Sequence, residues 1–412
     1  MIIVGVGGGI AAYKACALIR HFTEAGHEVR VIPTESALKF VGAATFEALS
    51  GHPVQTGVFE SIPEVPHVRL GQEAELVVIA PATADLMARA AQGRADDLLT
   101  ATLLTARCPV VFAPAMHTEM WEHAATRANV ATLRERGATV IEPASGRLTG
   151  KDTGAGRLPE PDQIGALADL LLEHPAGLQR DLEGRRVVIS AGGTKEALDP
   201  VRYLTNRSSG KQGYALARIA AQRGARVTLV AGNTIGLADP PAVDVVRIAS
   251  ALDLQAAMTA HAADADLVIM AAAVADYRPA QVADTKLKKG ADGRSDALET
   301  ITMIENPDVL AGLVQARRDG GLRPGTVIVG FAAETGDAQG SVLDYGRAKL
   351  QRKGCDLLVL NAVGDGRAFE VDENSGWLLG ADGNETALPL GSKMAMAARI
   401  LDAAVARVGS AR

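Results

Sequence analysis

The 412-residue chain has few aromatic residues, few cysteines and no long apolar run. Aromatic residues make up only 3% of the chain, so aliphatic side chains must fill the core, as is typical of α/β domains. The three cysteines, Cys16, Cys108 and Cys355, form no Cys-x-x-Cys pair, which argues against a disulfide framework or a structural zinc site. No apolar run approaches the ~20 residues of a membrane helix, and no basic leader precedes the first strand. We therefore expect a cytoplasmic protein without a membrane partner.

Positive charge is also scarce for a protein that would bind nucleic acid. The formal net charge is −6, which argues against a nucleic-acid partner. The length exceeds that of one ordinary domain, so two or three domains are expected.

What the chain does contain is a strand–glycine–helix pattern that starts twice, at Ile2–Gly9 and again at Val187–Thr194. A strand that leads through glycines into a helix N-terminus is a common phosphate-binding arrangement, because bare N–H groups and the helix dipole face the anion. Two such starts predict two sites and two reactions.

Strand and helix patterns alternate through the first half, which predicts a parallel sheet with helices on both faces. The helices are expected over 11–25, 126–136 and 161–173. The predicted strands are 2–5, 28–32, 76–80, 109–113 and 139–142. The resulting prediction is a doubly wound α/β domain over residues 1–175.

Residues 176–184 are polar and interrupted by glycine, which predicts a linker. A second doubly wound α/β domain is expected over 185–412, with a polar, mobile loop at 278–297, a β-hairpin excursion within 369–390 and a final helix at 392–408. Its predicted strands are 186–190, 226–231, 243–247, 266–271, 326–330 and 356–360.

Polar and glycine residues follow several strands of the first half. Gly7, Gly8 and Gly9 follow the first strand, but no Gly-x-Gly-x-x-Gly with a later acidic residue is present. Thr34 follows the second strand, and Ala82 and Thr83 follow the third. Each hydroxyl suits either a ligand or a helix N-cap, and the sequence leaves both open. Turns at the carboxyl ends of neighbouring strands favour a ligand crevice.

Two further segments of this half carry candidate chemistry. His67 lies between apolar residues in an expected loop and is able to act as a base. Met116 and His117 belong to the string Pro-Ala-Met-His after the fourth strand, where Met120 and Trp121 suit a core. Residues 146–157 form a glycine-rich segment that is too long for a simple turn and suits a flap over a ligand.

These motifs resemble the flavin-dependent phosphopantothenoylcysteine decarboxylases over residues 1–172, through Gly-Gly-Ile-Ala-Ala-Tyr-Lys, Ala-Pro-Ala-Thr-Ala-Asp and Pro-Ala-Met-x-x-x-Met. The resemblance implies a flavodoxin-like fold, bound FMN and decarboxylation of 4'-phosphopantothenoylcysteine. It also implies that His67 is the catalytic histidine and that Met116 and His117 contact the substrate. The flavin contacts are expected at Gly7, Gly8, Gly9, Thr34, Ala82 and Thr83.

The chain departs from the family pattern at two positions. His117 replaces the usual Asn, and Gly150 stands where the flap usually carries a proton-donating cysteine. The replacement donor stays open among Lys151, Asp152, His117 and solvent. One alternative is therefore a flavin-binding scaffold without decarboxylase activity, and another is an NAD(P)-dependent oxidoreductase, which the missing dinucleotide fingerprint disfavours.

The second half carries denser motifs but no Walker GxxxxGK[ST] sequence, so it is not a P-loop enzyme. Ser208, Ser209 and Gly210 can present N–H groups to an anion, and polar groups crowd around Asn206. Asp276 follows a strand and suits a base, a ribose or a metal ion. The lysines from Lys286 onward, with Asn306–Asp308, suit a triphosphate clamp rather than only a solvated surface.

Residues 185–408 resemble phosphopantothenate–cysteine ligase, through Asp-Pro-Val-Arg-Tyr, Asn-x-Ser-Ser-Gly-Lys, Ala-Ala-Val-Ala-Asp-Tyr-Arg, Lys-x-Lys-Lys, Asn-Pro-Asp and Gly-Phe-Ala-Ala-Glu-Thr. The resemblance implies a Rossmann-like fold and CTP-dependent coupling of 4'-phosphopantothenate to cysteine through an acyl-cytidylate, with Mg²⁺. Asn206 matches the position tied to that intermediate, and Arg202 is a second catalytic candidate in the same motif. The positions matched to CTP binding are Asp276, Lys286, Asn306, Pro307, Asp308, Val309, Phe331, Lys349 and Lys353.

The order of the two halves resembles the bifunctional bacterial enzymes of coenzyme A synthesis, in which the ligase product is the decarboxylase substrate. The resemblance also implies a homo-oligomer, with trimeric flavin domains and dimeric ligase domains. The sequence specifies no metal ligands.

Overall fold

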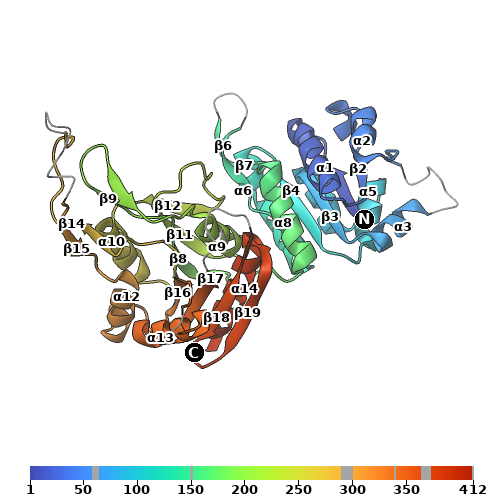
Figure 1. Cartoon of the computed structure of the whole chain (residues 1–412). Helices are drawn as coiled ribbons and strands as arrows, with labels where there is room; N and C mark the ends of the chain where they lie inside the picture. The colour runs from blue at the N-terminus through green and yellow to red at the C-terminus, as the bar shows by residue number, and fades with distance from the viewer. Residues whose placement is uncertain (58–64, 149–151, 289–299, 338–339, 363–372, 411–412) are drawn as a thin grey trace. The chain divides into compact units, whose positions relative to one another are not determined.

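The computed structural model describes residues 1–57, 65–148, 152–288, 300–337, 340–362 and 373–410 (Figure 1). It divides into two compact units, Met1–Gln179 and Arg180–Arg412, which are described separately below. Within the part of the chain that the structure describes, no helix has the length and apolarity needed to cross a membrane.

The first unit contains a five-stranded parallel sheet in the order β2-β1-β3-β4-β5. This is the flavodoxin-like order, in which ligands bind where the strand order reverses, between β1 and β3. The five strands are β1 (Ile2–Val6), β2 (Val29–Pro33), β3 (Leu76–Ala82), β4 (Val110–Pro114) and β5 (Thr139–Val140). The expected flavodoxin-like fold is thus confirmed.

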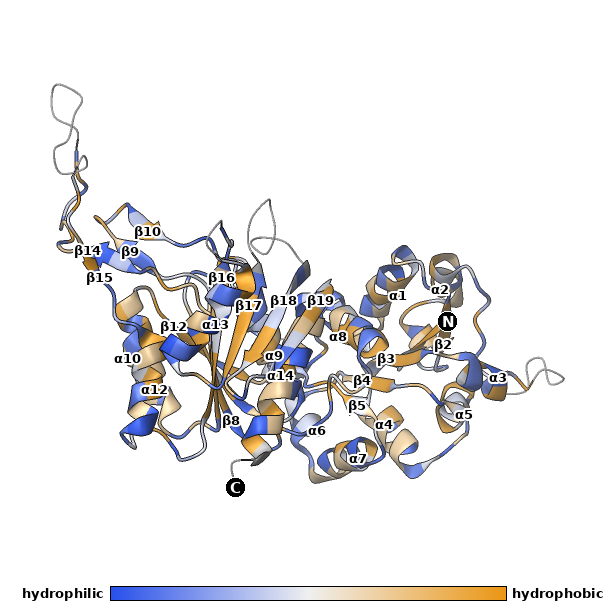
Figure 2. Cartoon of the chain, turned by 60° about the horizontal axis from the view of Figure 1, so that its bottom comes forward, coloured by the Kyte–Doolittle hydropathy of each residue, from blue (hydrophilic) through white to orange (hydrophobic). Residues whose placement is uncertain are grey.

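Helices cover this sheet and bury its aliphatic strands, which Figure 2 shows in orange. Ile3, Val77 and Ile79 are each 0% exposed, so aliphatic strand residues fill the core, as the scarcity of aromatic residues predicted. The helix expected at 11–25 is divided into a 3₁₀ turn and an α-helix. The helices are η1 (Ile10–Lys14), α1 (Ala15–Glu24), η2 (Ala37–Lys39), α2 (Ala43–Ser50), α3 (Pro66–Glu73), α4 (Ala84–Gln92), α5 (Leu98–Thr105), α6 (Thr118–Glu122), α7 (Ala124–Glu135) and α8 (Pro161–Glu173).

The second unit is built on an eight-stranded sheet in the order β12-β11-β8-β13-β16-β17-β18-β19. The first six positions are parallel and follow the Rossmann order 3-2-1-4-5-6, which confirms the expected fold. The strands are β8 (Arg186–Ala191), β11 (Arg226–Ala231), β12 (Val243–Arg247), β13 (Leu267–Met270), β16 (Val327–Glu334), β17 (Leu357–Ala362), β18 (Glu373–Gly380) and β19 (Glu385–Ser392).

The β-hairpin expected within residues 369–390 is part of the main sheet rather than an excursion from it. Strand β18 pairs antiparallel with β17 at the sheet edge, and β19 pairs antiparallel with β18, so the hairpin extends the sheet (Figure 1). Leu378 and Leu388 are 5% and 3% exposed, because α14 packs against this edge. The helices of the unit are α9 (Lys211–Gln222), α10 (Ala251–Ala262), α12 (Val309–Arg318), α13 (Val342–Lys353) and α14 (Lys393–Ser410).

Two small antiparallel ribbons were not predicted. One pairs β9 (Lys195–Ala197) with β10 (Tyr203–Thr205), and the other pairs β14 (Tyr277–Pro279) with β15 (Met303–Glu305). Strand β14 contacts β9, and Figure 1 shows both ribbons at the same end of the unit. Tyr277–Pro279 is therefore a strand where the sequence predicted the start of a loop.

The segment at the boundary between the units is anchored to the second unit by a buried arginine. Arg223 is 1% exposed and pairs with Asp181 and Asp402, which ties the start of the second unit to α9 and α14. Burial opposes the charge on Arg223, but the two carboxylates outweigh it and raise its pKa. The start of the second unit is thus fixed to its own domain.

Candidate functional sites

The glycines of the first unit lie at the carboxyl edge of its sheet, where β1 ends. Added Cβ atoms at Gly7 and Gly8 would approach the Pro81 carbonyl oxygen and Ser36 Cβ within 2.5 and 2.3 Å. These two glycines are therefore required by loop packing. Gly9 differs, because the nearest atom to an added Cβ is 3.8 Å away. Of the three, Gly9 leaves the most space for a ligand near the backbone.

The two threonines of this edge both act as local caps. Thr34 is 6% exposed, and its hydroxyl donates to the Val6 carbonyl and accepts the Ala37 N–H. The Thr83 hydroxyl accepts the Leu86 N–H and caps α4. Ala82 lies beside Thr83 and is fully buried. The side chains thus shape the loops, and the backbone between β1, β2 and β3 is what remains to contact a ligand.

His67 lies in helix α3, so the loop predicted for it is wrong. Its carbonyl accepts the Thr105 hydroxyl at 2.7 Å, which fixes the start of α3 against α5. Its ring Nδ1 is buried and has no hydrogen-bond partner among the described residues. A buried nitrogen of this kind normally has a partner, so its lack of one among the described residues marks His67 as a candidate functional residue.

The glycine-rich segment is a hairpin, formed by β6 (Ala144–Arg147) and β7 (Thr153–Arg157). It packs on the loop that carries His117, since the Met116 N–H donates to the Gly156 carbonyl at 2.9 Å. A Cβ at Gly154 would lie 2.3 Å from the Thr118 hydroxyl. His117 precedes α6 directly beneath this hairpin. The positions of Gly150 and Lys151 fall outside the described residues.

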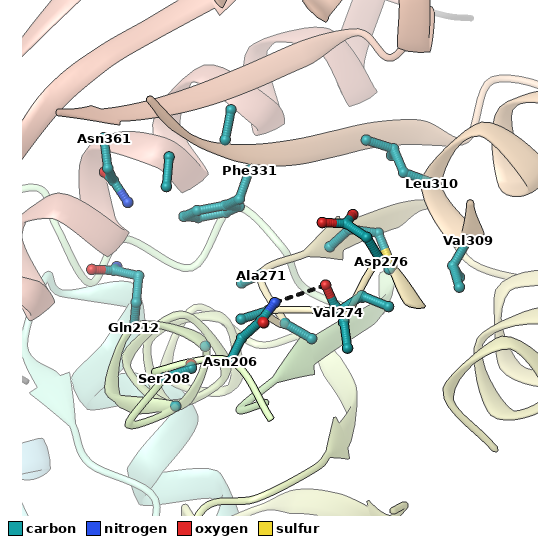
Figure 3. A pocket seen from close by; sticks show the side chains of 18 of the residues that line it. Asn206, Ser208, Gln212, Ala271, Val274, Asp276, Val309, Leu310, Phe331 and Asn361 are labelled. Atoms are coloured by element: carbon teal, nitrogen blue, oxygen red, sulfur yellow. Dashed lines mark hydrogen bonds between the residues drawn. The ribbon is translucent and has the colours of Figure 1, made fainter. Parts of the chain in front are cut away.

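A cavity of about 780 Å³ opens at the carboxyl edge of the second unit's sheet (Figure 3). Segments far apart in the sequence line it, from α9, the β13 end, α12, β16, α13, β17 and α14. The sequence-predicted residues among its lining are Asn206, Asp276, Asn306, Pro307, Asp308, Val309, Phe331, Lys349 and Lys353. Figure 3 shows Asn206 lying between Asp276 and Gln212.

The cavity is electropositive, although the chain as a whole is acidic. Six cationic side chains line it, against three carboxylates: Arg207, Lys211, Lys349, Arg352, Lys353 and Lys393 against Asp276, Glu305 and Asp308. The starts of three helices, α9, α12 and α14, also reach the lining. Helix N-termini carry partial positive charge and free N–H groups, so the cavity is suited to a ligand of high negative charge.

Two asparagines of the cavity hold its loops in different ways. Asn306 is 8% exposed, donates to the Ala275 carbonyl and accepts from Arg278, so it ties two loops together. Asn206 is exposed and donates its amide to the Val274 carbonyl at 2.9 Å (Figure 3). This bond orients the Asn206 side chain in the cavity.

The two predicted lysines on α13 are each paired with a carboxylate. Lys349 lies 2.9 Å from Glu334, and Lys353 pairs with Asp308, which also caps α12. Burial raises the pKa of Asp308, but Lys353 and the Ala311 N–H outweigh it, and the pKa falls below its usual range. Asp308 is therefore ionised and holds Lys353 at the cavity wall.

Two predicted residues do not line the cavity. Arg202 donates to the Leu287 carbonyl at 2.7 Å, and Lys286 is exposed on the same segment as Leu287. Arg202 thus contacts the backbone of the segment that carries Lys286. Arg202 lies outside the cavity lining because β9 and β10 form a separate ribbon, which the sequence pattern did not predict.

Sequence reasoning missed several lining residues near the late strands. Asn361 and Asn374 lie on β17 and β18, and Lys393 begins α14. Asn374 and Lys393 are 5% and 9% exposed. A buried polar residue at a strand end is a signal for such positions, but the sheet order that joins β18 to β17 was needed to find them.

Among the described residues, no group of three or more His, Cys, Asp or Glu side chains is arranged to hold a metal ion. The cavity carboxylates are instead spaced among cations.

The two units define a class of protein: a two-domain α/β enzyme with a flavodoxin-like domain followed by a Rossmann-like domain whose cavity suits a polyanionic ligand. Residues 1–171 match the family model described as "Flavoprotein". Residues 182–408 match the model of the DNA/pantothenate metabolism flavoprotein C-terminal domain.

Full-length relatives specify the family further. The chain is 68% identical to the coenzyme A biosynthesis bifunctional protein CoaBC of Mycobacterium bovis, over 98% of this chain and 96% of the relative. It is 44% identical to the protein of that name from Vibrio vulnificus, over 97% and 96%. A solved C-terminal domain of a CoaBC protein is 33% identical, covers 56% of this chain and 100% of that domain, and has a TM-score of 0.45. The chain belongs to the family of bifunctional coenzyme A biosynthesis proteins, which confirms the expected bifunctional enzyme with a flavoprotein decarboxylase domain and a ligase domain.

Proposed function

We propose that the second unit couples 4'-phosphopantothenate to cysteine at the expense of CTP, and that the first unit decarboxylates the product with FMN. The observation that carries the ligase proposal is the cavity of about 780 Å³, with its cationic lining and three helix N-termini. A nucleoside triphosphate is the reactant that needs such a surface, because its phosphates bear several negative charges.

The ligase reaction proceeds in two steps. A carboxylate oxygen of phosphopantothenate attacks the α-phosphorus of CTP, and pyrophosphate leaves. The cysteine amine then attacks the acyl carbon of the acyl-cytidylate, loses its proton and expels CMP. The carboxylate requires this activation because its oxygen is otherwise a poor leaving group.

The lining residues have distinct roles in this proposal. Lys349 and Lys353 bind nucleotide phosphates, while Phe331 and the backbone from Asn306 to Val309 hold the nucleoside. Asn206 is held by the Val274 carbonyl, so its own amide oxygen and remaining N–H face the reacting acyl group. Mg²⁺ enters with CTP, and Asp276 is an exposed carboxylate of the cavity lining that suits it.

The first unit offers a backbone cradle for the flavin phosphate and ring. Gly9 leaves open space at the end of β1, and the turns after β2 and β3 flank it. FMN, when bound, supplies the oxidation that turns the substrate thiol carbon into an electron sink. His67 is the base, because its buried Nδ1 has no partner among the described residues. His117 lies beneath the β6–β7 hairpin and binds the substrate.

We further propose that both units self-associate, the first as trimers and the second as dimers. Exposed apolar side chains support an interface on each unit: Ile10, Tyr13 and Phe40 on the first, and Val201, Tyr203 and Tyr277 on the second. Light scattering of the full chain tests this, since a monomer would contradict it.

The ligase proposal is tested by measuring pyrophosphate release with phosphopantothenate, cysteine and each of CTP, ATP and GTP. CTP-dependent release, with formation of phosphopantothenoylcysteine, is expected. Equal rates with all three nucleotides would refute the assignment of CTP. The flavin proposal is tested by the visible spectrum, where a band in the ~450 nm region and FMN in the denatured extract are expected.

A further inference from the structure

The turn between β9 and β10 carries a carboxylate that the ligase mechanism does not use. Asp199 has a side chain that is 0% exposed, although the turn itself lies at the edge of the unit. Its Oδ1 accepts the N–H groups of Val201 and Arg202, both at 2.8 Å. A fully buried carboxylate is costly unless such bonds satisfy it, so its presence requires an explanation.

The second oxygen of this carboxylate reaches a different part of the chain. Asp199 Oδ2 accepts the Leu287 N–H at 3.2 Å, and Arg202 donates to the Leu287 carbonyl at 2.7 Å. The backbone N–H and carbonyl of Leu287 are thus both bonded to side chains of the turn, those of Asp199 and Arg202. Arg202 Nε also lies 3.7 Å from Asp199, so the two side chains stabilise each other.

A third bond fixes the same segment a few residues earlier. The Ala283 N–H donates to the Leu198 carbonyl at 3.0 Å. The segment from Ala283 to Leu287 is therefore attached to the turn at both of its ends. Lys286 and Lys288 flank the attached residue, and both are exposed.

We propose that Asp199 is a positioning residue for the ligase reaction: with Arg202 it holds Leu287 and thereby directs Lys286 and Lys288 toward the nucleotide phosphates. This inference rests on the proposed use of CTP and on the proposed match of Lys286 to a CTP-binding position, since Lys286 and Lys288 are exposed and do not themselves line the cavity described above. Lysine side chains are long and flexible, so a fixed backbone reduces the entropy lost when they bind an anion. Asp199 and Arg202 act here through the segment of Lys286.

The test compares Asp199→Asn with Asp284→Asn in the full-length protein. An Asn amide nitrogen cannot accept the Leu287 N–H, so the variant loses that bond while the size of the side chain is kept. Asp284 is an exposed carboxylate in the same segment, which makes its variant a matched control.

Two measurements are made on each variant. Hydrogen exchange of the 283–288 backbone is expected to accelerate in Asp199→Asn, while exchange in the β8 and β13 strands stays as in the wild type. The KM for CTP is expected to rise about tenfold or more, with a smaller change in kcat and an unchanged KM for cysteine. Asp284→Asn should match the wild type in both measurements.

Faster exchange with an unchanged KM for CTP would overturn the positioning role, as would unchanged exchange at 283–288. Acceleration throughout the unit would indicate a merely structural residue and would also overturn it. If Asp199→Asn fails to fold, Arg202→Met replaces it, since this variant removes the bond to the Leu287 carbonyl and the ion pair with Asp199 but keeps the bond from the Leu287 N–H to Asp199. It should shift both readouts in the same direction. If the wild type does not use CTP, the proposed function fails, whereas the exchange result still reports on whether Asp199 holds the segment.

Discussion

The two units place their sites at the same edge of similar sheets, yet they build them from different groups. In the flavoprotein unit, Thr34 and Thr83 cap local turns, and the backbone beside Gly9 is what remains exposed to a ligand. In the ligase unit, six cationic side chains from several elements surround a cavity. On the functions proposed here, one architecture supports two chemistries: a cofactor held by backbone turns, and a polyanionic reactant held by charge.

The largest expected effect is that of substituting His67, which should impair one site and leave the other unchanged. We expect His67→Asn to lower CO₂ release from phosphopantothenoylcysteine by about 10²–10⁴-fold, because a general base of this kind contributes that much. Ligase turnover should remain at the wild-type rate. Loss of both activities would indicate misfolding, and retained CO₂ release would remove His67 from the mechanism.

The reciprocal variant is Asn206→Ala. We expect about a 10²–10³-fold loss of cysteine coupling, because Asn206, held by the Val274 carbonyl, is the side chain that we propose faces the reacting acyl group. Quenched reactions analysed by mass spectrometry should contain accumulated acyl-cytidylate. Cysteine coupling at the wild-type rate would show that Asn206 has no role in the reaction and only holds the loop through its bond to the Val274 carbonyl.

A smaller effect tests the role of charge in the ligase cavity. Lys353→Met leaves the carboxylate of Asp308 without its partner at the cavity wall, so we expect the KM for CTP to rise about tenfold. Lys353→Arg keeps the charge, so its KM for CTP should lie between those of the wild type and Lys353→Met. Lys39→Met, in the other unit, serves as the control for ligase kinetics, and an equal effect there would contradict a local electrostatic role.

The smallest effect is a pH dependence of stability at Asp199. Burial raises the pKa of this carboxyl, but three backbone N–H bonds and Arg202 outweigh it, so the pKa lies below its usual value. A depressed folded-state pKa contributes stability above the unfolded value of about 3.9, and that contribution is lost as the pH falls through the folded pKa. Thermal melts from pH 6 down to pH 3 should therefore converge for the wild type and Asp199→Asn. Parallel curves would show that the pKa of Asp199 is the same in the folded and unfolded states, which would contradict the lowered pKa.

The sequence predicted the sheets well because their aliphatic strands and connecting helices have strong periodic patterns. It did not predict β9, β10, β14 and β15, which have three residues each and largely exposed side chains. The position of Arg202 outside the cavity follows from the β9–β10 ribbon, so the sequence pattern could not place it. Its catalytic role stays a prediction.

The ligase site was predicted in large part because its residues follow strand ends. Asn361, Asn374 and Lys393 were missed because they reach the cavity only once the hairpin of β18 and β19 joins the sheet at β17. His67 was identified as a residue but placed in a loop, since helix α3 has only eight residues and begins at Pro66.

The central claim is that two consecutive reactions occur at separate sites of one chain. It is tested most directly by following CO₂ from cysteine labelled in its carboxyl carbon, in the Asn206→Ala variant supplied with phosphopantothenate and CTP. We predict almost no labelled CO₂ from these reactants, but wild-type release when labelled phosphopantothenoylcysteine is supplied directly. Labelled CO₂ from both mixtures, or from neither, would contradict the account.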